Sequence, residues 1–235
     1  LTDWRSAERM HDEKYPPMAG IFLWVISIAP APSNTALFNL LAQAFNYPDQ
    51  LLVEKLVSGE FTATLNEWLN VLQPEAAWTD RIAVMERKYT AAGQNEAELL
   101  LEMEKDYTRM FFSSKPRLVY LFESVYKEGK LLQESTFEIA RLYYEAGLNL
   151  VDDFKLPPDH IAVELEFMAY LYFNELAAMK KGNKENEALA QKLQKETLEK
   201  HLTNFGRTFA EKVVAHAATD FYKIMATVTT SILAA

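Results

Sequence analysis

The apolar residues of this chain recur with the spacing of amphipathic helices rather than that of strands. In the first such segment, a single helical face carries Leu37, Leu40, Leu41 and Ala44, which are spaced by three, one and three residues. Little glycine and few alternating runs of Val, Ile and Thr argue against sheets. The pattern predicts an all-α protein of about eight to ten helices. These helices are expected over the ranges 34–45, 51–57, 61–72, 75–92, 95–112, 133–146, 158–181, 184–204 and 205–234.

Two stretches interrupt this helical pattern. Residues 113–132 are the least regular part of the chain and are expected to form an ordered loop with short turns. Residues 147–157 separate two strongly periodic segments and are a candidate hinge. Because neither stretch has the composition of a long linker, we expect residues 34–235 to form a single compact domain.

Residues 1–33 are predicted to be an N-terminal extension. The run 19–29 is apolar over eleven residues, whereas a membrane-spanning helix needs about 20. The Pro and Ala residues that follow resemble the end of an export signal, but residues 1–18 carry more acidic than basic side chains, which is unsuitable for such a signal. We therefore expect no stable membrane insertion, and we expect the apolar run to pack on the body of the protein.

Composition and charge narrow the classes of partner. The chain is 49% hydrophobic and 24% charged, as soluble globular proteins are, and its net charge is −9. Nucleic acid is an unsuitable partner for such a chain, whereas a basic client would be attracted. The absence of cysteine excludes disulfides, zinc–thiolate sites and thiol nucleophiles, and it fits a cytoplasmic location.

The most informative segment is 156–171, LPPDHIAVELEFMAYL. Pro158 suits the first turn of a helix, and Asp159 adds negative charge at its positive end. His160 and Glu164 lie one turn apart on the same side of this helix. Glu164 and Glu166 lie within an otherwise apolar run that indicates a central helix, where carboxylates are unfavourable unless they are paired.

The residues alone leave three interpretations of this segment open. In the first, it is a helix cap with a purely structural role. In the second, it is a client-binding site. In the third, it is the centre of a helical enzyme, a hydrolase or a metal oxidase, that uses His160, Glu164 and Glu166. Within residues 34–235 no histidine follows a glutamate by three residues, and no HExxH motif occurs in the sequence, so metal ligation is disfavoured. Phosphate-binding glycine loops are absent from the sequence as well.

Several segments, in this order, resemble the TorD/DmsD/NarJ family of molybdoenzyme assembly chaperones. The matching segments span about residues 34–230. They are Leu40-Leu41-Ala42 with Phe45, Tyr47 and Pro48; Asp106-Tyr107-Thr108-Arg109-Met110-Phe111; Glu123-Ser124-Val125-Tyr126; Pro157-Pro158-Asp159-His160 with Glu164-Leu165-Glu166-Phe167-Met168; and His201-Leu202 with Phe205. Two positions depart from the family pattern. Leu156 stands where the family has glutamate, and Phe205 stands where it has tryptophan.

The resemblance implies a TorD-like all-helical chaperone without catalytic activity. It implies a cytoplasmic partner, namely the precursor of a molybdopterin-containing oxidoreductase catalytic subunit. The chaperone would bind the twin-arginine signal peptide or a terminal segment of that precursor, assist cofactor insertion and prevent premature export. An arginine-rich and then apolar peptide needs carboxylates and apolar walls. The candidate client-binding residues are Asp159, His160, Glu164, Glu166, Glu123, Tyr107, Phe111, Tyr126 and Phe167.

The resemblance also concerns cofactors and assembly. Weak guanine-nucleotide binding and domain-swapped dimers are implied for the family, and no residue of this chain decides between a monomer and such a dimer. No metal or other cofactor of the chain itself is expected. A further hypothesis places the apolar run 19–29 in the client-binding groove of the same or a neighbouring molecule.

Overall fold

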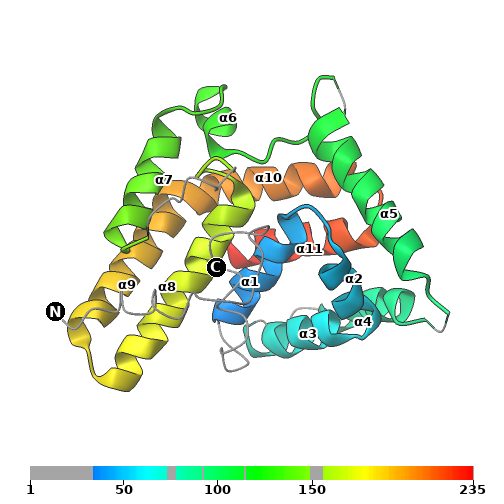
Figure 1. Cartoon of the computed structure of the whole chain (residues 1–235), viewed down its shortest axis with the longest axis horizontal. Helices are drawn as coiled ribbons and strands as arrows, with labels where there is room; N and C mark the ends of the chain where they lie inside the picture. Colours follow the sequence, from blue (N-terminus) through cyan, green and yellow to red (C-terminus); the bar gives the residue numbers. More distant parts are fainter. Residues whose placement is uncertain (1–33, 73–77, 92, 114, 149–155, 235) are drawn as a thin grey trace, which may run out of the picture.

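The computed structural model describes residues 34–72, 78–91, 93–113, 115–148 and 156–234, and these are helical throughout apart from short connections (Figure 1). No strand occurs among these residues, and their one β-type contact is an isolated antiparallel bridge between Phe122 and His160. The prediction of an all-α fold is confirmed. Residues 1–33 and most of the candidate hinge lie outside the described residues.

The first four helices agree closely with the apolar pattern. Asp49 caps the second of them by accepting a hydrogen bond from the Leu52 N–H, and Gly59, with φ +79°, separates the second from the third. The predicted stripe on the fourth is buried at Trp78, Ile82, Met85 and Tyr89. These helices are α1 (Asn34–Phe45), α2 (Gln50–Val57), α3 (Glu60–Leu72) and α4 (Trp78–Tyr89).

The fifth helix changes its winding near its end. Asn95 caps α5 (Glu96–Thr108) through hydrogen bonds from the N–H groups of Ala97 and Glu98. The chain then continues as a π-helical turn, η3 (Arg109–Ser113). A π-helical turn widens the helix and turns its side chains relative to the preceding residues. It therefore sets the direction of the aromatic residues at the end of this segment.

The stretch that we expected to be a loop contains a helix, α6 (Glu123–Glu128), followed by α7 (Glu134–Glu145). The prediction for residues 113–132 was thus incomplete. Phe122, at the N-cap position of α6, supplies no capping hydrogen bond, and Gly129 ends the helix with φ +77°. The local sequence lacks a start signal because the cap comes from elsewhere in the chain, as described below.

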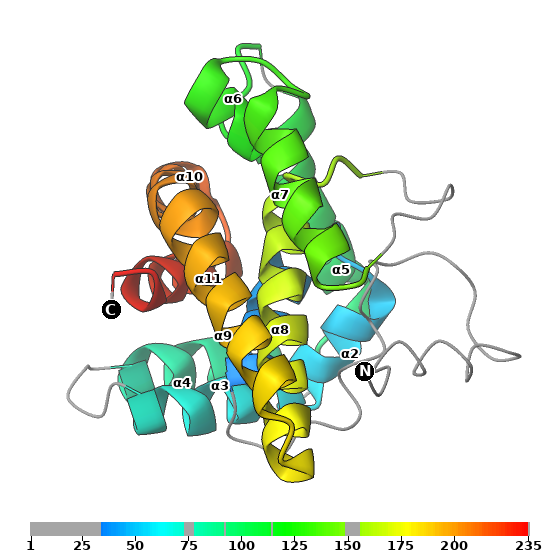
Figure 2. The same cartoon turned by 90° about the vertical axis from the view of Figure 1, so that its left-hand side faces the viewer.

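The remaining helices form the centre of the molecule and one side of it. They are α8 (Ile161–Lys181), α9 (Lys184–Thr197), the π-helical turn η4 (Leu198–Leu202), α10 (Thr203–His216) and α11 (Asp220–Ile232). Helix α8 packs along both α1 and α9, and α10 packs against α11 (Figures 1 and 2). The expectation of one helix over 205–234 was wrong, because Ala217 is extended and the chain starts a new helix at Asp220.

None of the described helices combines the length and the apolar character needed to span a bilayer.

Candidate functional site

Asp159 caps a helix other than the one it precedes. Its Oδ2 accepts a hydrogen bond of 2.9 Å from the Ser124 N–H, in the first turn of α6. The Asp159 carbonyl accepts a hydrogen bond from the Glu123 N–H at 2.9 Å, and the Ile161 N–H donates to the Leu121 carbonyl at 2.8 Å. These three bonds join α6 to the start of α8, and we call this region the α6–α8 junction.

His160 is the residue that caps α8 itself. Its Nδ1 accepts a hydrogen bond from the Ala162 N–H at 3.1 Å, and its ring meets the Phe122 ring edge-on at 5.4 Å between centroids. Burial lowers the pKa of His160 to about 3. The imidazole is therefore neutral near pH 7, and as a hydrogen-bond acceptor at Nδ1 it stabilises the first turn of the helix.

Glu123, on α6, links the junction to the π-helical turn η4. Its Oε2 lies 2.8 Å from His201 Nδ1, and its Oε1 lies 2.7 Å from Lys127 Nζ. The Lys127 ammonium also donates a hydrogen bond of 2.6 Å to the Lys200 carbonyl. Neither Lys127 nor His201 was among the sequence-predicted site residues, although His201 belongs to a matching segment.

Glu164 lies in the same junction and has no hydrogen-bond partner. The side chain is fully buried, and neither carboxyl oxygen is hydrogen-bonded to any described residue. Burial, followed by the negative charges of Glu123 and Asp159, raises the pKa of Glu164 well above its usual value. Of the predicted acids, three therefore come together here: Glu123, Asp159 and Glu164.

Glu166 is buried on another side of α8. Its Oε1 accepts a hydrogen bond of 3.5 Å from the Asn46 side-chain amide, next to the end of α1. Burial raises the pKa of Glu166 to about 7, and the Asn46 hydrogen bond opposes that rise. Glu164 and Glu166 are thus not a carboxylate pair, although they are only two residues apart.

The predicted aromatic residues are parts of the core. The Tyr107 hydroxyl donates a hydrogen bond of 3.1 Å to the Phe45 carbonyl, and Phe167 packs against Tyr143. Neighbouring rings connect three of the candidates in one series, Tyr107, Phe111, Phe209, Phe205 and Tyr126. Phe205, which stands at the family's tryptophan position, is buried in this series.

Burial is therefore the common property of the predicted site. Tyr126 is half-buried, and the other eight candidates are buried. They hold the helices together in this conformation, and none of those eight offers a surface to a client without a movement of its neighbours. Their role in client binding stays a prediction.

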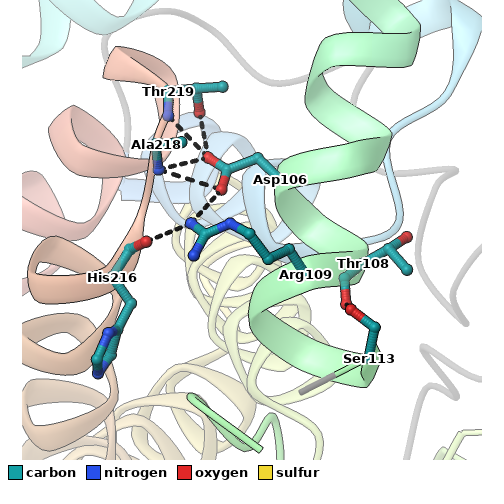
Figure 3. Close-up of polar contacts among 7 residues, drawn as sticks. All are labelled: Asp106, Thr108, Arg109, Ser113, His216, Ala218 and Thr219. Atoms are coloured by element: carbon teal, nitrogen blue, oxygen red, sulfur yellow. Dashed lines mark hydrogen bonds and ion pairs between the residues drawn. The ribbon is translucent and has the colours of Figure 1, made fainter.

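Asp106, in a second matching segment, forms the most heavily hydrogen-bonded acidic site described (Figure 3). Its carboxylate accepts from the Ala218 N–H at 2.9 Å, from the Thr219 N–H at 2.8 Å and from the Thr219 hydroxyl at 2.9 Å. Arg109 donates to it at 2.7 Å and also to the His216 carbonyl. Burial alone would raise the pKa of Asp106, but hydrogen bonds from Thr219, Arg109 and Ala218 outweigh burial and lower it.

We call this arrangement the Asp106 clamp, and it fixes both α11 and the π-helical turn η3. Asp106 supplies the cap for the start of α11, and Arg109, the first residue of η3, is held against the end of α10. The contacts join the end of α5 and the start of η3 to the turn between α10 and α11, more than a hundred residues later in the sequence (Figure 3). The Asp-Tyr-x-x-Met-Phe segment therefore has a structural role that its sequence did not reveal.

An exposed aromatic strip lies around the Tyr107 ring, and sequence reasoning missed it. We define the strip as Tyr47, Phe112, Arg117 and Tyr120. Tyr47 and Phe112 are each about half exposed and both lie against the buried Tyr107 ring. The Arg117 guanidinium lies 5.6 Å from the Phe112 ring and 5.4 Å from the Tyr120 ring. The sequence holds one signal for it, because 107–122 is rich in aromatic residues and contains no acid.

Among the described residues, no group of three or more His, Cys, Asp or Glu side chains is arranged to hold a metal ion. A metal oxidase would need several carboxylate and histidine side chains around one point. The geometry of the described residues therefore gives no support to the metal-oxidase alternative.

Known proteins are similar to this chain over most of the range that the matching segments span. Residues 56–211 match the model of the family described as nitrate reductase delta subunit. The chain is 29% identical over 161 residues to the chaperone protein TorD of Salmonella arizonae. The aligned region covers 68% of this chain and 70% of that protein. Over the same length and shares, it is 27% identical to TorD of Salmonella agona.

One solved structure has a similar fold. It is that of a protein from Archaeoglobus fulgidus described as a redox enzyme maturation protein, with a TM-score of 0.52 and 20% identity. The match covers 89% of this chain and 98% of that one. The curated relatives are named as chaperones rather than as enzymes, which confirms the prediction that the chain is not an enzyme.

Proposed function

Because the chain belongs to the nitrate reductase delta subunit family, which is the TorD/DmsD/NarJ family, we propose that it is a chaperone for the maturation of a molybdenum-containing reductase. It acts in the cytoplasm on the precursor of the catalytic subunit. It binds the signal peptide or a terminal segment of that precursor, assists cofactor insertion and delays export until insertion is complete.

The observation that carries this proposal is the family match over residues 56–211, which includes all nine candidate residues. The net charge of −9 supports it, because a basic leader is attracted over a long range by an acidic protein. The exposed aromatic strip supports it as well. Tyr47 and Phe112 offer apolar area for the hydrophobic part of a leader without any rearrangement of the core.

A titration with the leader peptide of a candidate reductase tests this function. The proposal expects saturable binding in a one-to-one complex that weakens as the salt concentration rises, because part of the attraction is electrostatic. Phe112→Ala should weaken binding, whereas Val84→Ala, which removes another half-exposed apolar side chain on α4, should leave it unchanged. A complete lack of binding to leaders and terminal segments alike would contradict the proposed function.

A further inference from the structure

Glu164 is an unusual residue for a protein core, because it is a carboxyl group buried without any partner. Its exposed fraction is 0%, and both oxygens lack hydrogen bonds to described residues. An ionised carboxylate at such a position would strongly destabilise the fold, because nothing replaces the water that solvates its charge. The uncharged acid is therefore the favoured form in this conformation, and a buried polar group of this kind needs an explanation.

The groups around Glu164 leave the junction short of positive charge. Three carboxyl groups share the Lys127 ammonium group and the His201 imidazole, and both of these already contact Glu123 rather than Glu164. The imidazole of His160 is neutral near pH 7. The titratable neighbours come from four elements: Glu123 and Lys127 from α6, Tyr143 from α7, Asp159 and His160 from the start of α8, and His201 from η4.

We propose that Glu164 is the group that meets a cationic side chain of the client, and that it releases its proton when this cation enters the junction. This inference rests on the proposed function and specifies how a basic leader is recognised. A guanidinium or ammonium group beside the three carboxyl groups supplies the missing positive charge, so the ionised form of Glu164 becomes favourable. The balance is simple, since one neutral acid and one cation become one ion pair and one proton in solvent.

A cation reaches Glu164 when α6 separates from the start of α8. The bonds that close this path are those of the junction, donated by the N–H groups of Glu123, Ser124 and Ile161. Client binding should therefore speed hydrogen exchange at these three amides. Exchange within the Asp106 clamp, at Ala218 and Thr219, should stay unchanged, because that clamp closes a different pair of elements.

Calorimetric titration with one defined probe tests this proposal. The probe is a synthetic peptide with an arginine pair before an apolar run, measured at about pH 8 in two buffers with different ionisation enthalpies. The unaltered protein should release about one proton for each peptide bound. Glu164→Gln, which resembles the uncharged acid in shape, should release none and bind the peptide several-fold more weakly.

Glu175→Gln is the matched control, since it makes the same change farther along α8, at a residue that belongs neither to the junction nor to the predicted client-binding residues. The Glu175 carboxylate accepts hydrogen bonds from the side-chain amides of Gln191 and Gln194 on α9. The Glu175→Gln variant should therefore release the same proton as the unaltered protein. A peptide with glutamine in place of both arginines should release none, and this comparison needs no variant of the protein.

The outcomes separate the two proposals. If the probe binds and Glu164→Gln releases the same proton, or if the glutamine peptide also releases it, the inference about Glu164 is overturned and the proposed function stands. If neither the probe nor any precursor segment binds the unaltered protein, the proposed function fails and the inference fails with it.

Discussion

The carboxylate of Asp159 accepts a hydrogen bond from the backbone N–H of Ser124, which lies 35 residues earlier in the chain. It therefore caps α6 rather than its own helix. Asp106 does the same for α11, across more than a hundred residues. The two aspartates in the matching segments are thus long-range helix caps, and each holds together two parts of the fold that local sequence does not connect.

Removing the cap from Asp159 should destabilise the junction. Asp159→Ala leaves the Ser124 N–H without its acceptor in a buried place, so the free energy of unfolding should fall by about 1–3 kcal/mol. Asp159→Asn keeps one acceptor oxygen and should cost less. Urea unfolding measures both. Asp80→Ala, at an exposed position in the first turn of α4, is the control. An Asp159→Ala protein as stable as that control would show that the cap is dispensable.

Asp106 should make the protein sensitive to acid. Its pKa is lowered in the folded state, so its stabilising contribution is present above the unfolded value and is lost as the pH falls through the folded one. Asp106→Asn should unfold about 2–4 kcal/mol more easily near pH 7. Its stability should also change less than that of the unaltered protein below about pH 4. Equal pH dependence of the two proteins in urea unfolding would contradict this account.

His160 should also make the folded protein less stable as the pH falls, but at higher pH values than Asp106 does. Its folded-state pKa of about 3 lies below the ordinary value, so the unfolded chain binds more protons and stability falls as the pH drops from about 6.5 towards 3. His160→Asn keeps a good capping residue and removes the titration, so it should flatten this slope. Thermal unfolding between about pH 4 and 7 measures the effect. A slope that persists in the asparagine variant must come from other groups.

Glu166 should make the folded protein less stable as the pH rises, which is the opposite of the effect of Asp106 and His160. Its pKa is raised to about 7 in the folded state, so the folded protein binds more protons, and stability falls as the pH rises from about 4.5 through 7. Glu166→Gln cannot ionise and should be more stable than the unaltered protein at pH 8, by about 1–3 kcal/mol. At pH 5 the two should differ little. Urea unfolding at both pH values decides this, and a variant that is less stable at pH 8 refutes it.

The sequence predicted which segments are helical because apolar periodicity is a local signal. The stripe of Trp78, Ile82, Met85 and Tyr89 is buried as expected. The two errors have one physical cause. Helix α6 and the break before α11 depend on caps from Asp159 and Asp106, and such distant partners leave no trace in the neighbouring residues.

The sequence predicted which residues make up the candidate site, but it did not predict whether their side chains are buried or exposed. The grouping of Glu123, Asp159 and Glu164 follows from the packing of α6 on the start of α8. The sequence predicted a loop over 113–132 instead of α6, so it did not predict this packing. Burial depends on all the surrounding helices, so the sequence did not distinguish the buried Phe111 from its exposed neighbour Phe112. Both rings belong to the π-helical turn η3, which has no local signature in this chain.

The central claim is that this protein binds the precursor of a molybdenum-containing reductase. Affinity purification of the chain from its native cells, with mass spectrometric identification of bound proteins, tests it most directly. The account predicts recovery of one such catalytic subunit with its terminal segment intact, in an amount that drops sharply when that segment is deleted from the precursor. Recovery of no molybdenum-containing reductase, or binding that is unchanged by the deletion, would contradict it.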